Sequence, residues 1–367
     1  MRQFNVEIFD RDMNFVCNTV TDNPKVREDY LDPEKYTVDL TGIQSGLGYF
    51  IHLLSEKEKY IGIITAFEDK KDGEKKLTIC EIPSLFDVEM IIDVEDFDYS
   101  MENYIKKWIE ALFKDGDSEM ALPLTVNVSS ETLNWSIDYK ILNEVEEDEE
   151  KPPVTVAKIN LFDDVILPAF TQYQIRLDYS IDLTQKKIVI DIGKNEAETI
   201  KIESDAKNII DKSVIIRKST RQTNKILVYD RENYNNFVTY YLHPDDSYDK
   251  NDTDRVSPVS YKILEAKKET EKEGDVEVVT KTFEEAAHEK AGENFSKNKY
   301  TNCITLKMIS DDELINPSSL KVGQKVSIVS DEIEYASILS GRNVTETTEL
   351  IFGTIRLELT KMLKGRA

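Results

Sequence analysis

Cysteine is scarce in this sequence, which has three among its 367 residues. The three lie far apart and none belongs to a CxxC pair: Cys17, Cys80 and Cys303. Closely spaced cysteines are what a structural zinc site or a redox-active disulfide requires. We therefore expect three reduced, partly buried thiols, and we assign no zinc site.

Histidine is equally scarce, and its three positions share no local signature: His52, His243 and His288. None is spaced as a metal-binding pair or belongs to a cysteine–histidine nucleophile motif. Gly46 and Gly48 lack the lysine of a P-loop and the third glycine of a dinucleotide fingerprint. The acidic run 245–254 lacks the central glycine and final glutamate of an EF-hand. We expect no catalytic residue, cofactor or metal, and predict that the chain is not an enzyme.

Long apolar runs are also missing. No window reaches the roughly 18 apolar residues of a membrane span. The first residues, MRQFNVEIFDRDMNF, carry charges where a signal peptide needs an apolar stretch. We expect a chain that is made and kept soluble, with no stable membrane insertion.

Positive charge is in deficit, because 47 Lys and Arg stand against 71 Asp and Glu, a formal net charge of -24. Such a surface repels phosphate backbones, so sequence-specific binding of nucleic acid is not expected. A channel through which DNA slides must not grip it. An acidic lining would therefore suit a DNA conduit.

Strand patterns dominate the first part of the chain. Phe4, Val6 and Ile8 alternate with polar residues, residues 10–14 supply turn chemistry, and Phe15 resumes the apolar run, which predicts a hairpin. Gly, Asp, Lys and Glu clusters separate further strand-like runs at 36–40, 48–54, 60–67 and 77–82. This spacing predicts an N-terminal β-barrel domain over residues 1–98.

Helical spacing replaces the strand pattern after residue 99. Apolar residues recur at helical intervals between 100 and 114, Ser100 is a plausible N-cap, and Gly116 follows the end. Six acidic residues in 143–150 precede two prolines, which is typical of an exposed linker. We expect a helical insert and acidic linker over 99–153.

Strand-like runs return over 154–243, where we expect a middle β domain that completes the first barrel. The clearest runs are 174–179, 187–191, 199–203, 212–218 and 225–230. Residues 244–299 are predicted as a loop and a helix, the helix at about 283–297, where Thr282 and Glu285 have capping-box spacing. Residues 300–367 predict C-terminal barrel strands at 303–309, 320–329, 333–339 and 350–359.

Several stretches resemble the hub region of siphophage tail-tip proteins, often called Tal or tail-associated lysin proteins, which are similar to the baseplate hub of contractile tails. In the C-terminal third these are TFEEAA, NCITLKM, NPSSLKVGQKVSIV and LIFGTIRLELTKMLK. FNVEIFDRDMNF near the start and NKILVYDRENY in the middle are also similar. The C-terminal stretches contain the structural motif residues Gly323, Phe352, Gly353 and Arg356.

The motif glycines have local physical reasons. Gly323 lies between two strand halves, where a bulge or turn needs permissive backbone angles. Gly353 interrupts an alternating strand, where another backbone can approach. Arg356 faces away from Ile355 and Leu357, and is either a partner across a subunit boundary or an ordinary solvated charge.

The resemblance implies a mainly β (α+β) fold with two tube-like β-barrel domains and inserted smaller α/β domains. It also implies a homotrimer at the tail tip of a virion, made in the host cytoplasm. Such a hub closes the tail tube beneath a ring of distal tail protein. It then passes the tape measure protein and DNA during ejection, and receptor-binding proteins of the baseplate are further partners.

The sequence leaves two alternatives open. A carbohydrate-binding host-recognition module would use the aromatic cluster at 234–241, although strand packing or a subunit contact also explains those residues. A cell-wall hydrolase would use a carboxylate pair, but so many acidic residues guarantee some suitable pair by chance. Because the sequence stops at Ala367, shortly after the last predicted strand, we expect no C-terminal peptidoglycan-cleaving domain.

Overall fold

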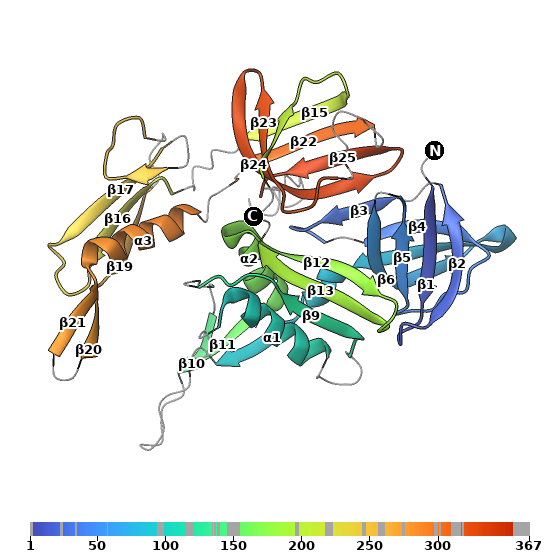
Figure 1. The fold of residues 1–367 in the computed structure, drawn as a ribbon, viewed down its shortest axis with the longest axis horizontal. Coiled ribbons are helices and arrows are strands. Elements are labelled where there is room, and N and C mark those ends of the chain that lie inside the picture. Colours follow the sequence, from blue (N-terminus) through green and yellow to red (C-terminus); the bar gives the residue numbers. More distant parts are fainter. Residues whose placement is uncertain are drawn as a thin grey trace, which may run out of the picture. The chain divides into compact units, whose positions relative to one another are not determined.

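The computed structural model describes the chain outside residues 1–2, 23–24, 34, 57, 94–98, 115–120, 134, 136, 138–139, 145–154, 195–197, 217–222, 244–246, 256–260, 274–275, 297–299, 301, 310–316, 318 and 355–367. The chain divides into two compact units, Met1–Ile215 with Asn302–Ala367, and Ile216–Thr301 (Figure 1). The larger unit is therefore built from both ends of the chain, and the smaller unit is an insertion that spans the predicted boundary at 243/244. The predicted Gly116 and most of the predicted acidic linker lie outside the described residues.

The first sheet of the larger unit is formed by N-terminal residues, as their alternation predicts. Its strands are antiparallel and run in the order β2-β1-β5-β6-β7-β4. Edge strands β2 and β4 contact each other, so the sheet curls into a half-barrel. The bounds are β1 (Phe4–Phe9), β2 (Phe15–Thr21), β4 (Lys35–Thr41), β5 (Phe50–Leu54), β6 (Lys59–Asp69) and β7 (Glu74–Glu81).

The predicted first hairpin is confirmed. Asp10 closes its turn, because its Oδ1 accepts from the backbone N–H groups of Asp12 at 2.9 Å and Asn14 at 2.8 Å. The alternating residues Phe4 and Val6 are fully buried in the core of the sheet. Burying a side chain of this kind stabilises the fold by about 1.5–3 kcal/mol.

A second curled sheet is formed mostly by C-terminal residues. Its main path runs β14-β23-β24-β25-β22-β15, and β3 pairs with β24 beside this path. Strands β14 and β23 are parallel, and the C-terminal strands pair antiparallel with one another. The bounds are β3 (Val26–Asp29), β14 (Ile200–Glu203), β15 (Ile209–Ile216), β22 (Asn302–Ile309), β23 (Lys325–Ser330), β24 (Ile333–Val344) and β25 (Thr347–Phe352).

The long strand β24 joins the two sheets. Its first half pairs with β23, and its second half pairs with β3, from Gly341 opposite Asp29 to Val344 opposite Val26. Val26 and Val344 are buried in the core of the first sheet. Strands β3 and β24 therefore belong to the second sheet while their valines pack into the core of the first. The sequence does not reveal β3, because VRED contains a single apolar residue.

Two three-stranded sheets and a helix form the insert of the larger unit. Helix α1 (Met101–Phe113) begins as predicted at Ser100, whose hydroxyl accepts from Asn103 N–H at 3.3 Å. One sheet has the order β10-β11-β8, and the other has the order β12-β13-β9 with β13 and β9 parallel. The bounds are β8 (Glu89–Asp93), β9 (Leu124–Val128), β10 (Lys140–Glu144), β11 (Thr155–Asn160), β12 (Ile175–Asp182) and β13 (Lys187–Lys194).

The middle of the chain was predicted as β only, and this was wrong for one segment. A π-helical turn, η3 (Leu161–Ile166), continues into α2 (Leu167–Tyr173). The Asn160 side chain caps the turn by accepting from the N–H groups of Phe162 at 2.9 Å and Asp163 at 3.0 Å. Pro168, in the first turn of α2, obscures the helical period in the sequence. Short 3-10 turns also occur at η1 (Lys71–Gly73) and η2 (Ile82–Phe86).

The smaller unit is a sheet covered on one face by a helix (Figure 1). The sheet has the order β18-β17-β16-β19, and β16 and β19 are parallel. Helix α3 (Phe283–Ser296) packs Ala287, Ala291 and Phe295 against it. The strands are β16 (Lys225–Asp230), β17 (Phe237–Leu242), β18 (Tyr248–Asp249) and β19 (Tyr261–Ala266), followed by a separate hairpin of β20 (Glu269–Glu273) and β21 (Val276–Lys281).

The prediction of a loop and helix over 244–299 therefore needs correction, because residues 261–281 contain three strands. Their sequences, YKILEA, ETEKE and VEVVTK, carry many charges, so no continuous apolar alternation marks them. The mainly β fold class with two curled sheets is confirmed. Within the described residues, no helix has the length and apolar character needed to span a membrane.

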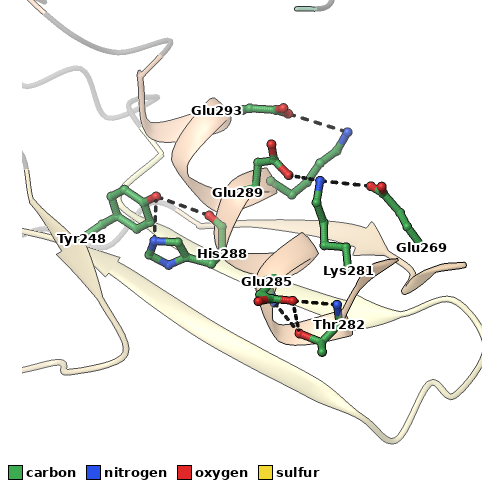
Figure 2. Close-up of polar contacts among 9 residues, drawn as sticks. Tyr248, Glu269, Lys281, Thr282, Glu285, His288, Glu289 and Glu293 are labelled. Atoms are coloured by element: carbon green, nitrogen blue, oxygen red, sulfur yellow. Dashed lines mark hydrogen bonds and ion pairs between the residues drawn. The ribbon is translucent and has the colours of Figure 1, made fainter. Parts of the chain in front are cut away.

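The predicted capping box of α3 is confirmed and appears in Figure 2. The N–H and hydroxyl of Thr282 both donate to Glu285 Oε2 at 2.8 Å, and Glu285 N–H donates back to the Thr282 hydroxyl at 3.3 Å. Lys281 Nζ pairs with Glu289 at 2.6 Å and with Glu269 at 3.1 Å. These contacts fix the start of α3 relative to the hairpin.

Replacing Thr282 by Ala is expected to destabilise the smaller unit by about 1 kcal/mol, because the helix loses its N-cap acceptor. Hydrogen exchange of the first-turn amides should accelerate in this variant, while Thr282→Ser should retain their protection. Equal exchange in both variants would contradict this role.

Candidate functional site

Phe352 and Gly353 lie at the end of β25, against β22 and β24. Phe352 is fully buried in the core of the second sheet. Gly353 has a φ of 87°, and a Cβ atom there would overlap the carbonyl oxygen of Asn302. Its N–H donates to Ile338 O at 2.8 Å, and its carbonyl accepts from the Ser340 hydroxyl at 2.6 Å. The position therefore requires glycine both for its conformation and for space.

Gly323 lies in the turn before β23 and also has a φ of 87°. A Cβ atom there would lie 3.0 Å from Arg176 Cδ and 3.6 Å from Phe170 Cε2. Its N–H donates to Leu339 O at 2.7 Å. The turn thus allows β12 and α2 to approach the second sheet. Arg356, the fourth motif residue, lies outside the described residues.

A cavity of about 410 Å³ lies in the larger unit, where both curled sheets meet the insert. Strands β3, β4, β6, β7, β12 and β24 all contribute to its wall, together with residues 320–322. Its inner residues Glu58, Glu81 and Arg342 are between 5% and 7% exposed, whereas Lys59 and Lys321 are exposed at its edge. The cavity is therefore charged inside and accessible to solvent.

Ion pairs connect the parts of the chain around this cavity. Arg342 Nε of β24 lies 2.8 Å from Glu28 Oε2 of β3. Within β3, Arg27 Nη2 lies 3.6 Å from Asp29 Oδ2, and Asp29 is fully buried. In each pair one partner is buried and the other is partly exposed, so removing the exposed partner destabilises the fold by leaving the buried charge less compensated.

The insert is held at the same place by β12 and Tyr30. Arg176 Nη2 lies 2.5 Å from Asp178 Oδ2, and Nη1 donates to Val322 O at 2.9 Å. The Tyr30 hydroxyl accepts from Leu177 N–H at 3.1 Å, and the Tyr30 ring stacks on Phe170 with centroids 4.2 Å apart. These contacts fix β12 and α2 against the segment that follows β3.

Glu81, at the end of β7, is a poorly compensated carboxyl in the cavity wall. Burial raises the pKa of its carboxyl well above the usual value, and Glu28 and Asp29 raise it further. The Asp29 backbone N–H donates to the carboxylate, but Oε1 has no hydrogen-bond partner among the described residues. A buried carboxyl of this kind favours the protonated form.

The thiols and histidines form no joint site. None of the three cysteines forms a disulfide with a described residue, and Cys80 and Cys303 are buried while Cys17 is partly buried. The histidines have separate partners: His52 Nδ1 lies 3.2 Å from Glu7, His243 Nε2 lies 3.0 Å from Asp249, and His288 stacks on Tyr248. In the part of the chain that the structure describes, no three His, Cys, Asp or Glu side chains are grouped to hold a metal ion.

The aromatic cluster at 234–241 is divided between the two faces of the sheet in the smaller unit. Tyr240 is 2% exposed and packs beneath α3. Phe237 and Tyr241 alternate with it and therefore point to the other face, where Phe237 is 59% exposed. Tyr234 is 73% exposed and lies beside Tyr229, with ring centroids 5.6 Å apart. An aromatic surface therefore remains on the face opposite the helix.

No model of a known protein family matches the sequence, and no curated protein matches it either. Solved structures do match. The tail protein from Neisseria meningitidis MC58 is 11% identical, with a TM-score of 0.50 over 95% of this chain and 96% of that chain. The 43 kDa tail protein of prophage MuSo2 from Shewanella oneidensis is 8% identical, with a TM-score of 0.50 over 96% and 98%.

The chain has the fold of these phage tail proteins. The resemblance inferred from the sequence is therefore confirmed at the level of the fold. A chain of the phage P2 baseplate in its activated conformation with Ca is 13% identical and covers 95% of this chain and 98% of that chain, with a lower TM-score of 0.47. The two tail proteins matched at a TM-score of 0.50 show the fold.

The cavity of this tail-protein fold was not predicted from the sequence. Its charged residues come from segments that are distant in the sequence, such as Glu28, Glu81 and Arg342. One feature of the sequence could have indicated the cavity. Glu81 lies between the apolar run LTIC and Ile82, and a surface charge without a partner is unusual at such a position. The pairing of β3 with β24 is what brings these residues together.

Replacing Gly353 by Ala is expected to destabilise the larger unit by about 3 kcal/mol or more, since left-handed strain is combined with steric overlap. Gly73→Ala is the matched control, because Gly73 has a φ of 75° and nothing within 4 Å of an added Cβ. The free energy of unfolding of the control variant, measured by urea unfolding, should fall by only about 1–2 kcal/mol. Similar losses in both variants would contradict the close packing at Gly353.

Replacing Glu81 by Gln is expected to stabilise the protein at pH 8 by about 1 kcal/mol, the scale of a poorly satisfied buried polar group. Because the folded-state pKa is raised, wild-type stability falls as pH rises from the unfolded value through the folded value. The Tm advantage of the variant should therefore disappear toward pH 4. Glu68→Gln, at an exposed position of β6, should show no such pH-dependent gain.

Proposed function

We propose that the chain is a structural protein of a bacteriophage tail, and more specifically the hub at the tip of a siphophage tail. The observation that supports this most is the length of the fold match. Both tail proteins at a TM-score of 0.50 match over at least 95% of this chain and at least 96% of their own chains. The shared fold therefore includes both curled sheets, the insert and the smaller unit.

In this proposal, three copies form a ring in which the curled sheets line a channel. Among the described residues, the edges of the second sheet offer positions for joining between chains. Strand β15 lies at one edge, and Ile210 and Ile215 on it are 55% and 38% exposed. An unpaired edge strand with exposed apolar residues favours contact with another chain.

The channel would carry the tape measure protein and then DNA during ejection, beneath a ring of distal tail protein. The net charge of -24 suits this role, because an acidic lining does not hold DNA. We place the protein in the virion tail, and we propose a structural role without enzymatic activity. The half-buried Glu28 and the buried Asp29 have arginine partners, which is typical of ion pairs that connect parts of a fold.

Light scattering and electron microscopy of the purified chain test the proposal, alone and mixed with the distal tail protein of the same phage. We expect particles of three times the chain mass of 42.3 kDa, with a central hole. Ile210→Asp should weaken this assembly, while Ile91→Asp, at another exposed strand position, should not. A strict monomer in both conditions would contradict the hub.

A second candidate function is carbohydrate binding by the aromatic face of the smaller unit. Phe237 and Tyr261 are each 59% exposed and lie on strands β17 and β19, on either side of β16. Flat aromatic rings on an open sheet can stack on sugar rings. If this function is correct, bacterial cell walls should bind the wild type and the control variant Phe67→Ala. They should not bind the double variant that carries both Phe237→Ala and Tyr261→Ala. Equal retention of all three would reject it.

A further inference from the structure

The cavity of about 410 Å³ contains a buried acceptor that the described residues leave unsatisfied. Glu81 is 6% exposed and lies in the wall, and its Oε1 has no hydrogen-bond partner among those residues. A buried carboxylate oxygen without a donor is unfavourable, and native structures rarely retain one. A ligand with positive charge would compensate it.

The rest of the wall defines the chemical class of that ligand. Four tyrosines line the cavity with Glu81: Tyr30, Tyr36, Tyr60 and Tyr179. Aromatic walls combined with a carboxylate are the chemistry that recognises organic ammonium ions. Within the described residues no group of metal-ligating side chains is present, so the wall is better suited to an organic cation than to a metal ion.

The arginines around the cavity do not remove the need for such a cation. Arg342 is paired with Glu28, Arg27 with Asp29, and Arg176 with Asp178. Each of these positive charges therefore already has a carboxylate partner. Among the described residues, the Glu81 carboxyl accepts from the Asp29 backbone N–H and is also attracted by Arg27, whose nearer carboxylate partner is Asp29. Three residues of the lining, Lys59, Ser180 and Lys321, are exposed, so the cavity is accessible to solvent.

We propose that this cavity binds a small organic ammonium ion, that binding releases the Glu81 proton to solvent so that the carboxylate pairs with the cation, and that the four tyrosines form its aromatic walls. The site lies between the two curled sheets and the insert, on residues of β3, β4, β6, β7, β12 and β24. A bound cation would therefore stabilise the arrangement in which these elements meet. This proposal does not depend on the hub function.

Calorimetric titration of the full chain with choline chloride tests the proposal. The matched ligand control is 3,3-dimethylbutan-1-ol, which has the shape of choline without its charge, and sodium chloride controls for ionic strength. We expect saturable binding of choline at one site per chain, and none of the neutral alcohol. Tetramethylammonium and putrescine extend the test to a smaller ion and to primary amines.

Replacing Glu81 by Gln should weaken choline binding by about tenfold or more, because the charged partner is lost. Unlike most variants that lose binding, this one should keep or gain thermal stability, so loss of folding cannot explain the result. Glu68→Gln should bind as the wild type does. Equal binding of choline and the alcohol, equal binding by Glu81→Gln, or no saturable binding of any of the three cations would overturn the proposal.

Discussion

The pairing of β3 with the second half of β24 is the interaction on which the larger unit depends. The Tyr30 N–H extends this pairing by donating to Ser340 O at 2.9 Å. Gly341 makes the close approach possible, because a Cβ atom there would lie 2.9 Å from the carbonyl oxygen of Glu28. Val344, at the end of β24, is buried in the core of the first sheet. Four residues from the N-terminal region thus connect a sheet built from the start of the chain to one built from its end.

This connection has an electrostatic consequence. It brings Glu28 and Asp29 of β3 close to Glu81 of β7 and Arg342 of β24, and Glu28, Glu81 and Arg342 line one cavity. Buried ion pairs contribute little net stability, because desolvation offsets their attraction, but breaking one leaves an unpaired charge. Such pairs favour one arrangement of the elements over others. The charge cluster therefore specifies how the sheets meet, while the apolar cores supply most of the stability.

Local sequence patterns predicted local structure well, but they did not predict which distant segments pair with one another. Alternation at Phe4 identified the first hairpin, and the side chains of Ser100 and Thr282 identified two helix starts, because each signal acts within a few residues. Strand β3 and the Glu81 environment depend on contacts between segments far apart in the sequence, and a single sequence contains no record of them. The strands between residues 261 and 281 escaped because charged residues interrupt their alternation.

The tail-protein fold is thus explained by a short strand that joins two curled sheets, with a charged cavity at the joint. Hydrogen exchange of the β3 amides tests this claim most directly, with the amides of β24 as the reference. If β3 is an integral part of the second sheet, those of its amides that donate to β24 and the N–H of Tyr30 should exchange as slowly as those of β24, and only on global unfolding. Fast exchange throughout β3 while β24 stays protected would contradict the account.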